Sequence, residues 1–220
     1  MDPLPAAALA RRRRIGGACL VLAPLVMLVA DTIGVLGGDG AFWVWSVGMW
    51  ISLLLFLAAI LEVVHQLAHR ADRFGLAFGA LAIVGLFTAA TMQGVFRVQY
   101  VLEEQAAGMG DIPIIMATSI APGILFPLSL LVLAIGLGRS RVLGWGAAIA
   151  LALGAILFPV GRFIIGDLRI SVASDALMLV GLLPLALRAW RASSPEAGYS
   201  GRGDLSERAE ELLDGMGRNG

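Results

Sequence analysis

Six long apolar runs, separated by short segments that carry charges, dominate the pattern of hydrophobic and polar positions along the chain. Each run has at least the length of about 20 residues that a helix needs to cross a hydrocarbon layer about 30 Å thick. The pattern therefore predicts an all-α polytopic membrane protein with six transmembrane helices. The predicted spans are residues 15–36, 41–64, 74–97, 112–137, 142–163 and 170–190.

The segments outside the apolar runs divide the chain into three parts. Residues 1–14 form a basic cytoplasmic arm, residues 15–191 form the six-helix transmembrane domain, and residues 192–220 form a polar cytoplasmic tail. The low hydrophobicity of the tail predicts that most of it is disordered. A capping-box pattern that begins at Asp204 favours one short amphipathic helix within it.

The composition supports the membrane assignment and excludes several kinds of covalent chemistry and metal site. The chain is 59% hydrophobic and 15% charged, with a mean hydropathy of +0.87, which lies outside the range of soluble globular proteins. All 16 basic residues are arginine, so no lysine can form a Schiff base. Cys19 is the single cysteine and can form neither an intrachain disulfide nor a multi-thiolate metal site. The sequence contains no recognisable nucleophile motif or phosphate-binding loop, and we assign no catalytic residue.

Arginine clusters mark alternate ends of the predicted spans. If all six runs cross the membrane, these clusters lie on one face, and the positive-inside rule makes that face cytoplasmic. Both termini are then cytoplasmic. Trp45 lies near the outer boundary, where an interfacial belt of aromatic side chains is expected. The clusters are Arg11 to Arg14, Arg70 with Arg73, Arg139 with Arg141, and Arg188 with Arg191.

Other charged residues gather near the outward ends of the spans. At a rise of about 1.5 Å per residue, Asp175 lies about 20 Å from Arg188 and is the deepest charge in the chain. An aspartate near a helix centre costs about 2.5–3.5 kcal/mol to insert. Asp175 and Asp31 are therefore expected to face the bundle interior and to pair with an arginine. The arginines within reach are Arg97, Arg162 and Arg169.

Asp31, Arg97, Arg162 and Asp175 thus define a candidate ligand-binding vestibule that opens outward. Two interpretations of it stand. In the favoured interpretation the ion pairs only fasten helix ends together. Most of these charges lie at the membrane boundary, where placing a charged side chain costs little free energy. In the other they bind a small polar ligand, an ion or a lipid head group.

A metal site is the weaker candidate. Glu62, His65 and His69 share one helical face at spacings of three and four, which could supply three ligands. Carboxylate-bridged di-iron bundles need two Glu-x-x-His motifs, whereas this chain has one and contains no other histidine. The predicted helix ends here, so solvent-facing side chains are expected. We expect neither a metal nor another cofactor.

The six runs resemble one unit used three times. Odd-numbered runs follow arginine and open with small residues, as in "RFGLAFGA" and "RVLGWGAA". This pattern favours three tandem helical hairpins, and a shared bias toward Gly, Ala and Leu is the alternative explanation.

Two short motifs lie in the second half of the chain. Residues 136–140 have the form Gly-x-x-Arg-Ser, and residues 158–162 have the form Phe-Pro-x-Gly-Arg. In these features the chain resembles a group of small bacterial integral membrane proteins with six predicted spans, of the domain-of-unknown-function type. The resemblance implies a six-helix bacterial inner-membrane protein and transfers no activity or catalytic residue.

Together these features favour a non-enzymatic, multi-pass plasma-membrane protein. It would be an accessory subunit or a binder of a small molecule or lipid through the outward-facing vestibule. The expected partners are the lipid bilayer, such a ligand and another membrane protein, and no nucleic acid. Two alternatives stay open: an intramembrane enzyme that acts on a lipid or isoprenoid with Asp175 as acid or base, and a proton-coupled carrier.

Overall fold

The computed structural model describes residues 6–38, 40–68, 72–105 and 124–193, without the side chains of residues 6, 65–68, 72–76, 92, 95–105 and 163. This described part is helical and contains no β-strand, as the predicted all-α class requires. Its elements are α1 (Ala6–Leu36), α2 (Ala41–Ala68), α3 (Asp72–Gln105), α5 (Leu125–Arg139), α6 (Trp145–Pro159), the π-helical turn η1 (Val160–Ile165) and α7 (Leu168–Arg191).

Four of the described helices are long and apolar enough to cross a membrane. The apolar parts of α3 and α5 are shorter, over Ala77–Thr91 and Leu125–Arg139. The first half of the predicted span 112–137 lies outside the described residues. The four long segments are Ala7–Leu36, Ala41–Val64, Trp145–Arg162 and Leu168–Arg191.

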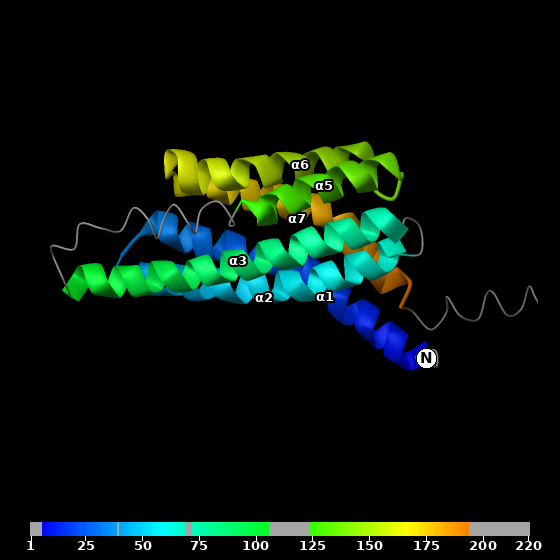
Figure 1. Cartoon of the computed structure of the whole chain (residues 1–220), viewed down its shortest axis with the longest axis horizontal. Helices are drawn as coiled ribbons and strands as arrows, with labels where there is room; N and C mark the ends of the chain where they lie inside the picture. Colours follow the sequence, from blue (N-terminus) through cyan, green and yellow to red (C-terminus); the bar gives the residue numbers. More distant parts are fainter. Residues whose placement is uncertain (1–5, 39, 69–71, 106–123, 194–220) are drawn as a thin grey trace, which may run out of the picture.

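The helices pack in a closed ring that follows the order of the chain. Each described helix contacts its neighbours in sequence, and α7 completes the ring by packing against α1. The helices run along the long axis of the bundle, and the first turns of α1 extend beyond it (Figure 1). Large side chains that are at most 1% exposed fill the interior, among them Met27, Phe56, Phe126, Leu151 and Met178.

The outer surface of the bundle carries many large apolar side chains. Leu54, Phe87 and Val180 are more than half exposed, and many other large aliphatic side chains point outward. Helices that are hydrophobic on every face are stable in lipid, whereas such a surface would cause a soluble protein to associate. The structure therefore supports a membrane-embedded bundle.

Glycines bring α6 and α7 into close contact. A Cβ atom at Gly181 would lie 2.7 Å from the backbone nitrogen of Leu151, and one at Gly154 would lie 2.9 Å from the carbonyl oxygen of Ser174. Small residues allow transmembrane helices to approach in this way. Ser174 Oγ also donates to the Gly154 carbonyl over 2.8 Å. This contact holds α7, the helix that carries Asp175, in register with α6.

Three of the arginine clusters meet at one end of the bundle. Arg14 donates to Ser193 Oγ and to the Ser193 carbonyl over 3.3 and 3.2 Å. Arg188 donates to the carbonyl of Val142, in the turn that follows Arg139 and Arg141. The side chains of Arg70 and Arg73 lie outside the described residues.

Candidate functional site

A buried ion-pair cluster joins α1, η1 and α7 near the end of the bundle opposite the arginine clusters. Arg162 Nη2 donates to Asp31 Oδ2 over 2.5 Å and contacts both carboxylate oxygens of Asp175 over 3.3 Å. Neither aspartate has any exposed surface, and 5% of the Arg162 side chain is exposed. We call these three residues the Asp–Arg–Asp triad. It contains three of the four predicted vestibule residues, and the side chain of Arg97 lies outside the described residues.

Residues that the sequence analysis did not assign to the site complete its surroundings. Trp45 Nε1 donates to Asp31 Oδ1 over 2.7 Å. The guanidinium carbon of Arg162 lies 3.9 Å from the centre of the Phe158 ring, a cation–π arrangement that suits arginine. Trp45 was expected only in an interfacial belt. The sequence indicated that Trp45 lies close to the outward boundary. It did not indicate the direction in which the side chain points.

The local structure around Pro159 directs Arg162 inward. Proline has no backbone N–H and disturbs the helix in which it lies. After Pro159 the chain continues as η1, which ends at Gly166 with a φ of 72°. A π-helical turn changes the direction in which side chains leave the helix, and such turns are frequent at functional sites. A Cβ atom at Gly161 would lie 2.8 Å from the backbone nitrogen of Ser171, so this glycine allows η1 to contact α7.

Arg162 has donors that the triad does not use. Its Nε and Nη1 atoms are buried and have no hydrogen-bond partner among the described residues. Ser171 Oγ, one helical turn before Asp175 on α7, also lacks a partner there. Buried polar groups without partners cost free energy. Each of these atoms would therefore gain free energy from a hydrogen-bond partner, in water or in a ligand.

The triad contains two carboxylates but one guanidinium, so its formal charge is −1 when all three groups are ionised. An uncompensated charge is costly inside a low-dielectric bundle. One bound proton, one cation or a cationic ligand group would neutralise it.

Arg169, which was expected within reach of the aspartates, does not join the triad. It is exposed, and its backbone N–H donates to Asp167 Oδ1 over 2.9 Å at the start of α7.

The structure corrects the expected position of Glu62. This residue is 1% exposed instead of facing solvent, because Gly16 has no Cβ atom that would collide with it. Arg12 Nε lies 4.0 Å from Glu62 Oε2. The side chains of His65 and His69 lie outside the described residues. Among the described side chains, no three His, Cys, Asp or Glu residues form a group that could hold a metal ion.

Comparison of the chain with protein-family models, curated proteins and solved structures finds no match. The resemblance to small bacterial membrane proteins stays a prediction. The function must be inferred from the site itself.

Proposed function

We propose that the chain is a six-span protein of the bacterial plasma membrane, with both ends cytoplasmic. Support comes from four long apolar helices, two shorter apolar helices that would supply the remaining spans, an apolar outer surface and three arginine clusters at one end. The ring places α1 beside α2, α3 beside α5 and α6 beside α7, an arrangement that is compatible with three tandem hairpins.

Cysteine labelling tests this topology. In a Cys19→Ser background, Leu36→Cys at the end of α1 and Ser140→Cys between α5 and α6 place thiols at opposite ends of the bundle. A membrane-impermeant maleimide added to intact cells is expected to label only the Leu36→Cys variant. Labelling of the Ser140→Cys variant before lysis would contradict the proposed orientation.

We further propose that the protein is a non-enzymatic binder, or an accessory subunit that acts through binding, and that the Asp–Arg–Asp triad holds its ligand. The observation that carries this proposal is the pair of buried Arg162 nitrogens, Nε and Nη1, that lack an acceptor. Fastening of α1 to α7 uses only Nη2. The other donors remain for a molecule that is not part of the described chain.

The triad also restricts the class of ligand. Nε and Nη1 of Arg162 require an acceptor, such as a carbonyl, ether or hydroxyl oxygen. The two carboxylates outnumber the guanidinium, so an anionic ligand would be repelled, whereas a neutral or cationic one would not. The favoured ligand is therefore a small polar molecule or lipid head group that carries oxygen acceptors and no net negative charge.

Analysis of molecules that copurify with the protein tests this binding. The wild type, Arg162→Gln, Asp175→Asn and the exposed control Arg169→Gln are purified in a mild detergent, and gel filtration confirms folding. Mass spectrometry of organic extracts is expected to find a species in the wild type and in Arg169→Gln that both triad variants lose. Identical extracts from all four folded proteins would exclude a ligand site at the triad.

A proton-coupled carrier is the second candidate function. The formal charge of −1 on the triad favours it. The triad, in which two carboxylates share one guanidinium nitrogen, becomes neutral when it takes up one proton. In liposomes with an imposed membrane potential and an internal pH-sensitive dye, the wild type should then carry proton flux that Asp175→Asn lacks. Flux equal to that of empty liposomes would exclude the carrier.

The geometry favours an intramembrane enzyme less, because Asp175 is fully buried and paired with Arg162.

A further inference from the structure

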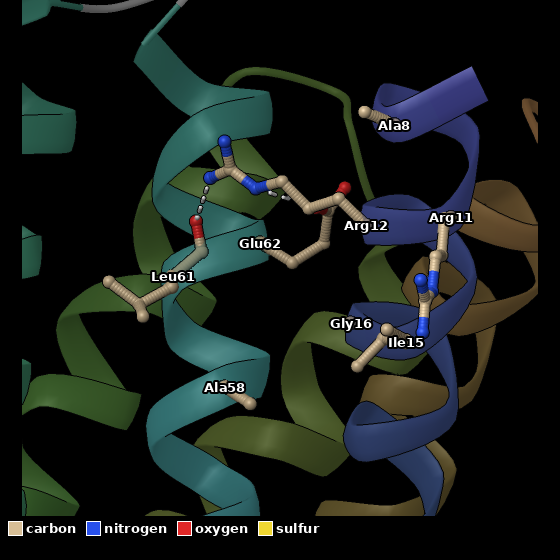
Figure 2. A pocket seen from close by; sticks show the side chains of 8 residues that line it. All are labelled: Ala8, Arg11, Arg12, Ile15, Gly16, Ala58, Leu61 and Glu62. Atoms are coloured by element: carbon tan, nitrogen blue, oxygen red, sulfur yellow. Dashed lines mark hydrogen bonds and ion pairs between the residues drawn. The ribbon is translucent and has the colours of Figure 1, made fainter. Parts of the chain in front are cut away.

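A second polar site lies at the arginine end of the bundle, between the first turns of α1 and the last turns of α2 (Figure 2). It is a pocket of about 370 Å³. Arg11 and Arg12 from α1 and Glu62 from α2 provide its charged groups, and Ile15 and Leu61 provide apolar wall. We call it the basic pocket. It shares no residue with the Asp–Arg–Asp triad.

The apolar wall of the basic pocket belongs to the lipid-facing surface. Ile15 is 51% exposed and Leu61 is 46% exposed. Ile15 directly follows the arginine run at residues 11–14, and the Leu61 carbonyl accepts a hydrogen bond from Arg12. The pocket therefore lies where hydrocarbon-facing surface meets charged side chains. This is the level of the phospholipid head groups.

The four consecutive arginines divide into two pairs. Arg13 donates to the carbonyl of Ala192 over 3.4 Å, and Arg14 contacts Ser193, so both are directed toward the end of α7. Arg11 and Arg12 instead line the basic pocket, and Figure 2 shows Arg12 extending across to α2.

The pair that lines the pocket has unused binding capacity. Arg12 makes one hydrogen bond, to the Leu61 carbonyl over 3.4 Å, and its Nε is 4.0 Å from Glu62. Within the described part of the chain, Arg11 makes no hydrogen bond or ion pair. Each guanidinium carries five N–H donors in a planar fork that matches phosphate oxygens. The Arg12 guanidinium reaches across to α2 and the Arg11 guanidinium lies along α1 (Figure 2), so the two side chains offer N–H donors from two sides of the pocket and neither is matched by an anion of suitable geometry within the described residues.

Glu62 determines which phosphate fits best. With two arginines and one carboxylate, the basic pocket has a formal charge of +1, which a phosphodiester with a single negative charge balances. A phosphomonoester or inorganic phosphate carries about −1.5 to −2 near neutral pH, and its second charge would be repelled by Glu62. A head group with hydroxyl groups could in addition donate to this buried carboxylate.

We infer that the basic pocket binds the phosphodiester of an anionic phospholipid whose head group carries hydroxyl groups, of which phosphatidylglycerol is the simplest probe. Arg12 holds the phosphate, the exposed side chain of Arg11 turns toward it and adds the second positive charge, Glu62 accepts from the head-group hydroxyl, and an acyl chain lies along Ile15 and Leu61. The site is a lipid site because its apolar wall continues into the lipid-facing surface.

Native mass spectrometry of the full-length protein tests the inference. The protein in detergent is titrated with phosphatidylglycerol or phosphatidylcholine. Each arginine near a membrane surface contributes about five-fold in affinity for anionic lipid, so the double variant Arg11→Gln/Arg12→Gln should bind phosphatidylglycerol about thirty-fold more weakly. Arg13→Gln comes from the same arginine run but is directed toward the end of α7, so it removes only a general surface charge and should weaken binding by at most about five-fold.

Three results would overturn the inference. Equal weakening by Arg13→Gln would indicate a diffuse surface charge effect instead of a pocket. Equal binding of phosphatidylcholine would show that the negative charge is not recognised, and full competition by millimolar inorganic phosphate would indicate a free-phosphate site. If the double variant does not fold, the wild-type melting temperature decides: phosphatidylglycerol should raise it and phosphatidylcholine should not, and no difference between them counts against the site.

Discussion

Replacement of Arg162 by glutamine should destabilise the bundle strongly, because it leaves two buried carboxylates without their shared partner. Asp31 and Asp175 have no exposed surface, and both contact Arg162 Nη2. Removal of one partner from a buried ion pair costs about 3–5 kcal/mol. For a chain of this length, 1 kcal/mol shifts the melting temperature by about 2–4 °C. Arg162→Gln should therefore melt about 6–20 °C below the wild type, which tryptophan fluorescence of the detergent-solubilised protein can measure.

Two further variants identify the cause of that loss. Arg169→Gln removes an exposed arginine near the same end of the bundle and should stay within about 0.5 kcal/mol of the wild type. Addition of Asp31→Asn and Asp175→Asn to Arg162→Gln replaces three charges with neutral amides and should restore most of the lost stability. If Arg162→Gln melts at the same temperature as Arg169→Gln, the three charges are not coupled in a desolvated site and the reasoning fails.

Two smaller perturbations test the surroundings of the triad and the helix packing that positions it. Trp45→Phe removes the N–H donor to Asp31 and should cost about 1–3 kcal/mol, but much less in a background that carries Asp31→Asn. Gly181→Ala should cost about 1–3 kcal/mol, because its Cβ atom would meet the backbone of Leu151 at 2.7 Å. Gly146→Ala, also in a helix but with open space around it, should be neutral or stabilise by up to about 1 kcal/mol. Equal effects of the two glycine variants would contradict the close packing of α6 and α7.

The helical architecture and the level of the charged residues could be predicted from the sequence. Apolar runs of more than 20 residues have few alternatives to helix in a membrane. A fixed rise per residue then converts sequence separation from the arginine clusters into depth. This counting placed Asp31, Arg162 and Asp175 near one end of the bundle, where the structure brings them together.

The choice of ion-pair partners could not be predicted in the same way. Depth does not determine the direction in which a side chain leaves its helix, and runs that are apolar on every face give no periodic signal for it. The π-helical turn after Pro159 turns Arg162 toward the aspartates, whereas Arg169 stays exposed. The burial of Glu62 was missed for a related reason. Its position near the end of an apolar run predicted a solvent-facing side chain, but Gly16 on a neighbouring helix leaves room to bury it.

The two polar sites lie at opposite ends of α1, since Arg12 and Asp31 are separated by about 28 Å at a rise of about 1.5 Å per residue, close to the hydrocarbon thickness of about 30 Å. The same helix therefore reaches the charged layer on both sides.

At the triad, one variant can separate the contribution to stability from the contribution to binding. Replacement of a buried ion cluster by apolar residues of similar volume is often neutral or stabilising, by about 1–4 kcal/mol. If the triad only fastens helices, the variant Asp31→Leu/Arg162→Met/Asp175→Leu should fold stably and behave like the wild type in every binding assay. If the unused nitrogens of Arg162 hold a ligand, the same variant should stay stable and lose the copurified molecule.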